Sequence, residues 1–329
     1  MSSSLLNYIG RRLLQLLPIA LLIVLTTYIL LRLAPGDMAD VIAGESGAAT
    51  PEYMTQLRSQ FSLDLPAGTV FLNYLRNLLH FDLGFSFHNS MPVADLILER
   101  VGPTLVLMLT SLIIAATLGV TLGVLSARYR GSWLDEVISA LSTIGFATPV
   151  FGAGLVLIVV FSVHLKWLPS AGMSSIGGPP ATSWTGFVER VRHLVLPALT
   201  LSFFYLAIYV RITRSAMLEV YGLDFVRTAR AKGLSELRVS LKHVLRNALL
   251  PVVTLTGMQL ASLMGGSIVI ETIFAWPGLG RLTFDAVFYR DINLLLGVFL
   301  FSSLLVVLMN LLVDILYAFL DPRVVGGRS

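Results

Sequence analysis

Six long apolar runs divide this 329-residue chain, and they constrain its fold more than any other feature. Each is long enough for an α-helix to cross the hydrocarbon core of a bilayer, which takes about 20 residues. The chain is 56% hydrophobic and only 13% charged, and its mean hydropathy is +0.82. These values argue against a soluble or nucleic-acid-binding protein and predict an all-α polytopic membrane protein with six transmembrane helices. The runs lie at roughly 10–31, 103–127, 137–165, 194–213, 249–274 and 292–319.

The distribution of Lys and Arg predicts which side of the membrane each end of the chain faces. Six crossings place both termini on one side, and cytoplasmic segments usually carry an excess of positive charge. With the N-terminus inside, fourteen of the 23 Lys and Arg residues fall in the shorter inner segments and nine in the longer outer ones. We therefore predict a multi-pass protein of the cytoplasmic (inner) membrane with both termini in the cytoplasm.

The runs divide the chain into three parts. Residues 1–33 form the first transmembrane helix, which is longer than the apolar core of a signal peptide and is expected to be retained. Residues 34–102 form an extracytoplasmic segment with short helices. Residues 103–329 form a five-helix core, and its cytoplasmic loop at 214–248 is the most informative stretch of the sequence.

This inner loop is typical of two short helices joined by a turn. Asp224 suits the positive N-terminal end of a helix over 224–232, and Gly233 can end that helix in the left-handed conformation. Ser235 is placed to cap a second helix, whose apolar residues form one stripe of 3.6-residue period. The loop suits the docking of a partner; a surface loop on anionic lipid remains an alternative, and a DNA-binding helix-turn-helix is disfavoured because membrane tethers both ends. The stripe consists of Leu237, Leu241, Val244, Leu245 and Ala248.

Two motifs in the loop resemble the "EAA" loop of ABC importer permeases, in the variant of the dipeptide/oligopeptide/nickel permease family. They are Phe225-Val226-Arg227-Thr228-Ala229-Arg230-Ala231-Lys232-Gly233-Leu234 and His243-Val244-Leu245-Arg246-Asn247-Ala248-Leu249-Leu250-Pro251. Arg227-Thr228-Ala229 stand where the general pattern has Glu-Ala-Ala, a departure that fits the peptide/nickel branch. The long segment after the first run resembles the first, B-type, permease of a pair. Matching pieces also occur at 32–37, where Met38 then replaces the usual Pro, and at 81–86, 103–105, 271–282, 310–314 and 320–323.

The resemblance implies an ABC importer permease fold and an ATP-driven import mechanism. A second homologous permease, the C-type, would complete the pathway, two ABC ATPase subunits would bind inside, and an extracytoplasmic solute-binding protein would deliver the solute. ATP and Mg²⁺ would be bound by the ATPases, and this chain would bind no cofactor. The implied substrates are dipeptides or oligopeptides, with nickel chelates, glutathione or another small solute as alternatives. The implied ATPase-coupling residues are Tyr221, Asp224, Phe225, Arg227, Thr228, Ala229, Arg230, Ala231, Lys232 and Gly233.

Three polar residues within the apolar runs are candidates for lining the pathway or for locking helices together: Gln259, Asn310 and Asp314. Asn310 and Asp314 lie four residues apart and so share a helix face. A secondary transporter, the rival class, should show acidic or basic relays in mid-membrane or broken helices in repeated halves. The sequence shows no such repeat, and its best candidate for a buried acid, Asp314, lies near one end of a run.

The predicted outer surface holds candidates for contact with the binding protein. They are Lys166 at the outer end of the third run, and Arg281 and Asp285 after the fifth. Between these, Pro277-Gly278 predicts a turn, and the neighbouring Trp276 suits the membrane interface.

Several kinds of catalytic chemistry are missing from the sequence. The chain has no cysteine, none of its lysines follows a glycine in a phosphate-binding loop, and no histidine begins an HExxH motif. We therefore predict a non-catalytic membrane subunit that holds no metal and binds no nucleic acid.

Overall fold

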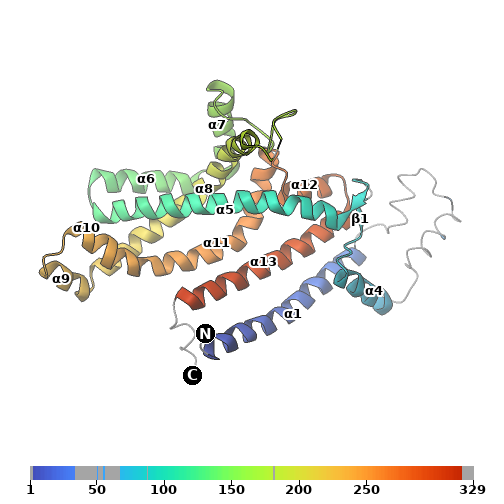
Figure 1. Ribbon diagram of the computed structural model, residues 1–329, viewed down its shortest axis with the longest axis horizontal. Helices are drawn as coiled ribbons and strands as arrows, with labels where there is room; N and C mark the ends of the chain where they lie inside the picture. The colour runs from blue at the N-terminus through green and yellow to red at the C-terminus, as the bar shows by residue number, and fades with distance from the viewer. Residues whose placement is uncertain are drawn as a thin grey trace. The chain divides into compact units, whose positions relative to one another are not determined.

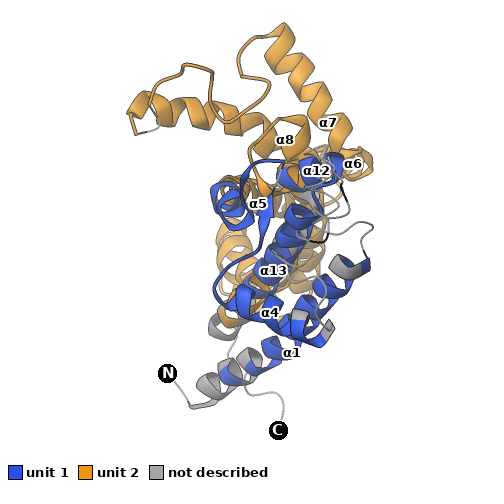
Figure 2. Cartoon of the chain, turned by 90° about the vertical axis from the view of Figure 1, so that its right-hand side faces the viewer, with its two compact units in different colours: residues 1–101, 282–308 blue, residues 102–281, 309–329 orange. Residues whose placement is uncertain are grey.

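The structure is a computed structural model that describes residues 3–33, 50, 55, 67–86, 88–180 and 182–320 (Figure 1). The chain divides into two compact units, residues 1–101 with 282–308 and residues 102–281 with 309–329 (Figure 2). Most of the motif at 32–38 and nearly all of that at 320–323 lie outside the described residues, as does most of the segment 34–66.

In the described part of the first unit, the chain begins with two helices and a hairpin. They are α1 (Ser3–Leu33), α4 (Ala67–Leu79), β1 (Phe85–Ser86) and β2 (Met91–Pro92), and the two strands pair antiparallel. Tyr28 of α1 packs edge-on against Phe71 of α4, with ring centroids 5.1 Å apart. α4 is one of the short helices expected in the segment 34–102, and the Ser86 hydroxyl after it donates to the Asp291 carboxylate at 2.6 Å.

The second unit holds most of the remaining helices. Within it, α5, α6 and α8 run alongside one another, and α9 and α10 lie at one end (Figure 1). α5, α12 and α13 each continue from one unit into the other. The bounds are α5 (Val93–Arg128), α6 (Trp133–Ala147), α7 (Val150–Leu157), the π-helix η1 (Ile158–His164), α8 (Trp184–Tyr221), α9 (Asp224–Ala231), α10 (Glu236–Arg238), the π-helix η2 (Val239–Leu245), α11 (Arg246–Ile273), α12 (Leu279–Phe288) and α13 (Ile292–Leu320).

The predicted apolar runs all fall in helical segments, but the third is not the single straight span that we expected. α6 and α7 with η1 are bent by 105° at the break between them. Thr148 there is extended, with φ −79° and ψ 126°, as expected of a residue before Pro149, whose ring also removes a backbone donor. By length and hydropathy, three helices in the described part of the chain qualify as spans and this bent pair makes a fourth, so the count of six stays a prediction.

Two glycines bring α5 into close contact with α8. Gly119 and Gly123 lie one turn apart, and a Cβ added at either would overlap α8: at Gly119 it would meet the Tyr209 Cβ, and at Gly123 the Thr213 Cβ at 2.6 Å. Small residues at this spacing let helix backbones approach closely in membrane proteins. α5 and α8 therefore form a tightly packed pair, and a core that includes Leu107, Leu201 and Tyr209 lies beside the contact.

Candidate functional site

The predicted helix at 224–232 is present as α9, Asp224–Ala231. Asp224 lies in its first turn and Arg230 in its last, so both charges complement the helix dipole. Gly233 follows with φ +78°, which confirms the predicted left-handed stop. The turn is closed by two backbone bonds, from Gly233 N to Arg230 O at 2.9 Å and from Leu234 N to Ala229 O at 3.4 Å.

α9 has one buried side and one exposed side. Val226 and Ala229, three residues apart, are 0% and 5% exposed. They belong to an apolar cluster, here called the coupling base, against which the buried side of α9 packs. Its buried members are Val124 and Ala127 of α5, Ala216 and Met217 of α8, Val226 and Ala229 of α9, Val239 and Val244 of η2, and Ala248 of α11.

The opposite side of α9 is exposed to solvent. Phe225 is 42% exposed and Leu223, the residue before the helix, is 46% exposed. Arg227 and Thr228 are exposed as well, and Arg227 makes an ion pair with Asp224 in which both side chains are largely solvated. Such an exposed pair adds little stability. The face therefore combines apolar and cationic groups on a helix whose other side is fixed.

The second helix of the loop differs from the prediction. Ser235 occupies the capping position, but its side chain accepts no capping hydrogen bond. The predicted apolar stripe is wrong at its start, because Leu237 and Leu241 are 51% and 48% exposed while Val239 and Ser240 are buried. The reason is that residues 239–245 form the π-helix η2, which has more residues per turn than an α-helix and so shifts the buried side.

Polar side chains tie the ends of α9 to its neighbours. The Tyr221 hydroxyl donates to the Ser240 hydroxyl at 2.7 Å, which gives this buried group of η2 a partner. The Arg230 guanidinium donates to both oxygens of Glu236, at 2.8 and 3.2 Å, and lies 5.5 Å from the centre of the Tyr221 ring. The hydrogen bond from Arg230 lowers the pKa of Glu236, so the pair stays ionised at neutral pH and weakens only as the pH falls through that lowered pKa.

A buried carboxylate that the sequence analysis missed lies beyond the coupling base. Asp135, in the first turn of α6, is 5% exposed. The Arg214 guanidinium of α8 donates two hydrogen bonds to this carboxylate, from Nε to Oδ1 at 2.8 Å and from Nη2 to Oδ2 at 2.9 Å. Its oxygens also accept a hydrogen bond from the Ser126 hydroxyl of α5 and one from Gly131 N, the latter at 3.0 Å. One side chain thus joins three helices, and we call this group the Asp135 clamp.

One sequence signal for the clamp was available. Ser132 caps α6 by accepting from the Asp135 backbone N–H, a Ser-x-x-acid pattern that marks a helix start. The pattern indicates where Asp135 lies in the helix, but the partnership with Arg214 spans 79 residues and could not be read from sequence.

A second buried carboxylate organises the turn between α11 and α12. Glu271 is 0% exposed and accepts from the Thr104 hydroxyl at 2.8 Å and from Arg281 N, in the first turn of α12, at 3.0 Å. The Thr104 oxygen in turn accepts from Leu279 N at 2.7 Å. Trp276, which we expected at the membrane interface, packs inside the protein: its side chain is 1% exposed and its indole N–H donates to Pro103 O at 2.9 Å.

We expect Glu271→Gln to lower the free energy of unfolding by about 1.5 kcal/mol, because both carboxyl oxygens accept hydrogen bonds and the amide would replace one of them with an NH2 group that cannot accept. The measurement is unfolding of the purified chain in detergent micelles with increasing sodium dodecyl sulfate. Glu219→Gln, the same change at an exposed site on α8, is the control and should have almost no effect. Equal stability of the two variants would contradict the capping role of Glu271.

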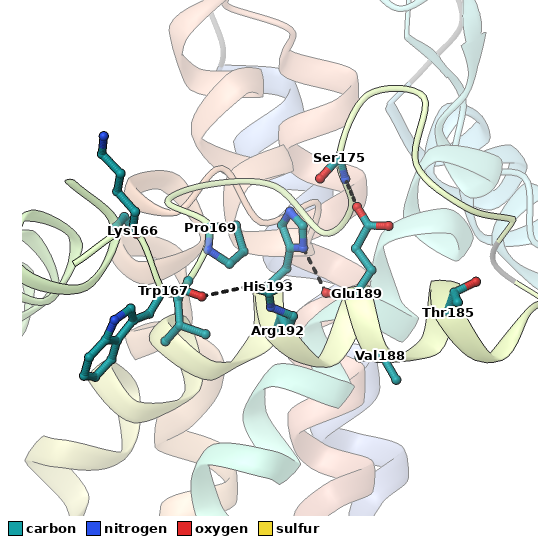
Figure 3. A pocket seen from close by; sticks show the side chains of 11 residues that line it. Lys166, Trp167, Pro169, Ser175, Thr185, Val188, Glu189, Arg192 and His193 are labelled. Carbon is teal, nitrogen blue, oxygen red and sulfur yellow. Dashed lines mark hydrogen bonds between the residues drawn. The ribbon is translucent and has the colours of Figure 1, made fainter. Parts of the chain in front are cut away.

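The predicted binding-protein contacts lie in different surroundings. Lys166 is exposed and lines a cleft of about 440 Å³ between the end of η1 and the start of α8 (Figure 3). In this cleft Arg192 donates to Trp167 O at 2.8 Å, and Glu189 accepts from Ser175 N at 2.7 Å. Arg281 and Asp285 are half-buried rather than fully exposed as we expected. Arg281 donates to Ala275 O at 2.8 Å.

Family models match nearly the whole chain. Residues 119–326 match the model described as "Binding-protein-dependent transport system inner membrane component", and residues 5–108 match the N-terminal model of the same kind of system. The chain belongs to this family. It is therefore a permease of a binding-protein-dependent importer, and the resemblance described above is confirmed.

Relatives of this permease share its full length. A putative peptide transport system permease protein of Brucella abortus is 42% identical over 95% of this chain and 97% of that protein. The dipeptide transport system permease protein DppB of Escherichia coli K12 is 40% identical over 97% and 98%. The glutathione transport system permease protein GsiC of Escherichia coli O6:H1 is 41% identical over 97% and 99%.

The fold of the permease also matches a solved structure. An inward-facing structure of the MetNI methionine ABC transporter contains a chain that is 20% identical, with a TM-score of 0.56, over 69% of this permease and 96% of that chain. At this identity the likeness shows the fold alone. The predicted ABC importer permease fold is thereby confirmed.

The polar residues predicted within the membrane are not brought together in one visible site. Gln259 is half-buried on α11, and Asn310 is exposed on α13. The side chain of Asp314 lies outside the described residues. Across the described residues, no group of three His, Cys, Asp or Glu side chains is placed to hold a metal ion. The roles of these residues and the absence of a cofactor stay predictions.

Proposed function

We propose that this permease imports peptides, together with a second homologous permease, two ABC ATPase subunits and an extracytoplasmic solute-binding protein. Dipeptides are the first candidate, because relatives 40% and 42% identical over nearly the whole chain carry dipeptide and peptide names. Glutathione is the second candidate, because the glutathione permease is 41% identical and so no more distant than the dipeptide permease. ATP would be bound and hydrolysed by the ATPases alone.

The coupling role of α9 rests on one observation, which is that the helix is packed on one side and bare on the other. Phe225 and Leu223 would fill an apolar groove on an ATPase, and Arg227 would lie at its rim. The coupling base would make α9 move together with α5, α8 and α11 when the ATPases close. This proposal requires α9, and with it both chain termini, to face the cytoplasm.

A crosslink tests the contact directly, because the chain has no cysteine of its own. We expect Thr228→Cys on the exposed side of α9 to crosslink to a lysine of an ATPase subunit when the complete complex is treated with a short reagent that carries a maleimide at one end and an amine-reactive ester at the other. Lys166→Cys, which is also exposed but lies in the predicted outer cleft, is the control and should react only with reagents or partners outside. A complex in which Thr228→Cys touches no ATPase, or reacts from outside in sealed vesicles, would refute this arrangement.

The substrate is tested on the binding protein that works with this permease. Dipeptides and glutathione are titrated into the purified, ligand-free binding protein, and import of the bound solute is then measured in proteoliposomes that contain the complete complex. Tight binding and import of a radiolabelled dialanine would support the dipeptide proposal. Binding of glutathione alone would replace it with the second candidate.

Three further assignments complete the proposal. Lys166, in its cleft, would contact an acidic side chain of the binding protein, and Arg281 and Asp285 would each be a further contact for it. Gln259 and Asn310, which are half-buried and exposed in the single chain, would line the pathway or pack on the second permease, and Asp314 would share the face of Asn310.

A further inference from the structure

The Asp135 clamp lies between the packed seam of α5 and α8 and the coupling base. Arg214 follows Thr213, the residue that packs against Gly123. Two and three residues further along α8, Ala216 and Met217 belong to the coupling base on which α9 packs. Any movement of α9 that reaches α8 through the base therefore reaches the clamp within one helical turn.

The clamp is one of two contacts in which a charged residue of α8 holds α6; in the other, the Arg211 guanidinium lies 5.4 Å from the centre of the Phe146 ring. Asp135 lies at the start of α6, whose remaining turns pack along α8, and Arg214 holds it with both nitrogens of a planar fork. A bidentate guanidinium–carboxylate pair fixes an angle as well as a distance. The bonds from Ser126 and Gly131 fix the same carboxylate to α5 and to the turn that follows it.

We propose that Asp135 and Arg214 are positioning residues for transport, which hold α5, α6 and α8 as one body so that movement of α9 turns all three helices together. The inference rests on the proposed coupling role of α9. In this proposal the ion pair acts through its contacts within the protein, which make the connection between α9 and the membrane helices rigid. Without it, α9 and α8 move while α6 lags, and ATP is hydrolysed with less import.

A purely structural role makes a different prediction, and the two can be separated. Removing Arg214 leaves Asp135 as an unpaired buried charge, which is costly, whereas replacing both charged groups by neutral ones of similar shape often restores stability. The double variant Asp135→Asn with Arg214→Gln therefore leaves no unpaired charge but also has no ion pair. If the clamp serves only for stability, this variant should transport normally; if transport requires the rigid ion pair, it should not. Arg214→Lys is a second test, because it keeps the positive charge and loses the fork.

The experiment compares ATP hydrolysed per dialanine imported, using the complete complex in proteoliposomes. We expect the double variant and Arg214→Lys to assemble and hydrolyse ATP, but to import roughly tenfold fewer dialanine molecules per ATP, in the range of coupling energies between distant sites. Two controls, Glu136→Gln beside Asp135 and Arg130→Gln in the turn before α6, are exposed and should keep the wild-type ratio.

A wild-type ratio in either the double variant or Arg214→Lys overturns the proposal and leaves the clamp a role in folding only. Failure of the proposed function is distinguishable, because it affects the wild type. A wild-type complex that hydrolyses ATP but imports no dialanine has another substrate, and the clamp is then measured by the stimulation of ATP hydrolysis on adding the binding protein. Stimulation lost in the clamp variants and kept in both controls supports the proposal, and stimulation kept in all of them overturns it.

Discussion

Replacing both Gly119 and Gly123 with alanine is expected to lower the free energy of unfolding of the permease by about 4 kcal/mol, since overpacking one site typically costs about 1–3 kcal/mol. Each new Cβ would overlap atoms of α8, and the Val210 carbonyl oxygen, 2.9 Å from the Cβ at Gly123, is backbone that cannot rotate away. α5 and α8 must then separate along their whole seam. Unfolding of the purified chain by sodium dodecyl sulfate in mixed micelles measures the loss.

Gly152→Ala is the matched control for this pair. It lies within α7, and a Cβ at this position would meet nothing within 4 Å. Alanine is favoured over glycine in helices by about 1 kcal/mol, so this change should be neutral or slightly stabilising. If alanine at 119 and 123 has the same effect as alanine at 152, the close approach of α5 and α8 is not what stabilises this unit.

Gly233→Val is expected to reduce solute import by about tenfold while the permease still inserts and assembles, since a left-handed residue other than glycine costs roughly 1–2 kcal/mol and a β-branched one more. Gly233 has φ +78°, and a Cβ there would meet no neighbouring atom, so the strain is in the backbone alone. The chain relieves this strain by changing the conformation of the turn, and the angle between α9 and η2 then changes. Import and ATP hydrolysis by the complete complex in proteoliposomes measure the effect.

Gly233→Asn is the control, because asparagine tolerates the left-handed conformation far better than valine and adds a side chain of similar size. We expect it to keep most of the import activity. Equal loss in both variants would mean that the side chain itself blocks a partner. Equal retention would mean that the turn does not set the position of α9.

Most of the fold was predictable because apolar run length carries so much information in a membrane protein. The runs became helices, since a backbone in hydrocarbon has to satisfy its own hydrogen bonds. The bend at Thr148 was not predicted. Proline in a membrane helix is often tolerated, and only tertiary packing decides between a kink and a break, so Pro149 alone did not distinguish a straight span from two helices at 105°.

The candidate site was predictable where its residues are neighbours in sequence. Asp224, Gly233 and the polarity of α9 follow from local rules about helix ends. Asp135 and Glu271 were harder, because the groups that bind them come from distant parts of the chain. Asp135 was not singled out from the sequence, and Glu271 was noted only as part of the matching segment 271–282. Their burial depends on which helices meet, and that is set by side-chain packing rather than by any local pattern.

The π-helix η2 has a consequence for how length variation in this loop would be felt. In an α-helix of 3.6 residues per turn, one added residue rotates everything on one side of it by about 100°. The wider turns of Val239–Leu245 already hold more residues than that, so loss of one residue there would let the stretch return to an α-helix. The direction in which α9 faces should therefore tolerate a one-residue deletion in this stretch better than a one-residue insertion in the α-helix that follows it.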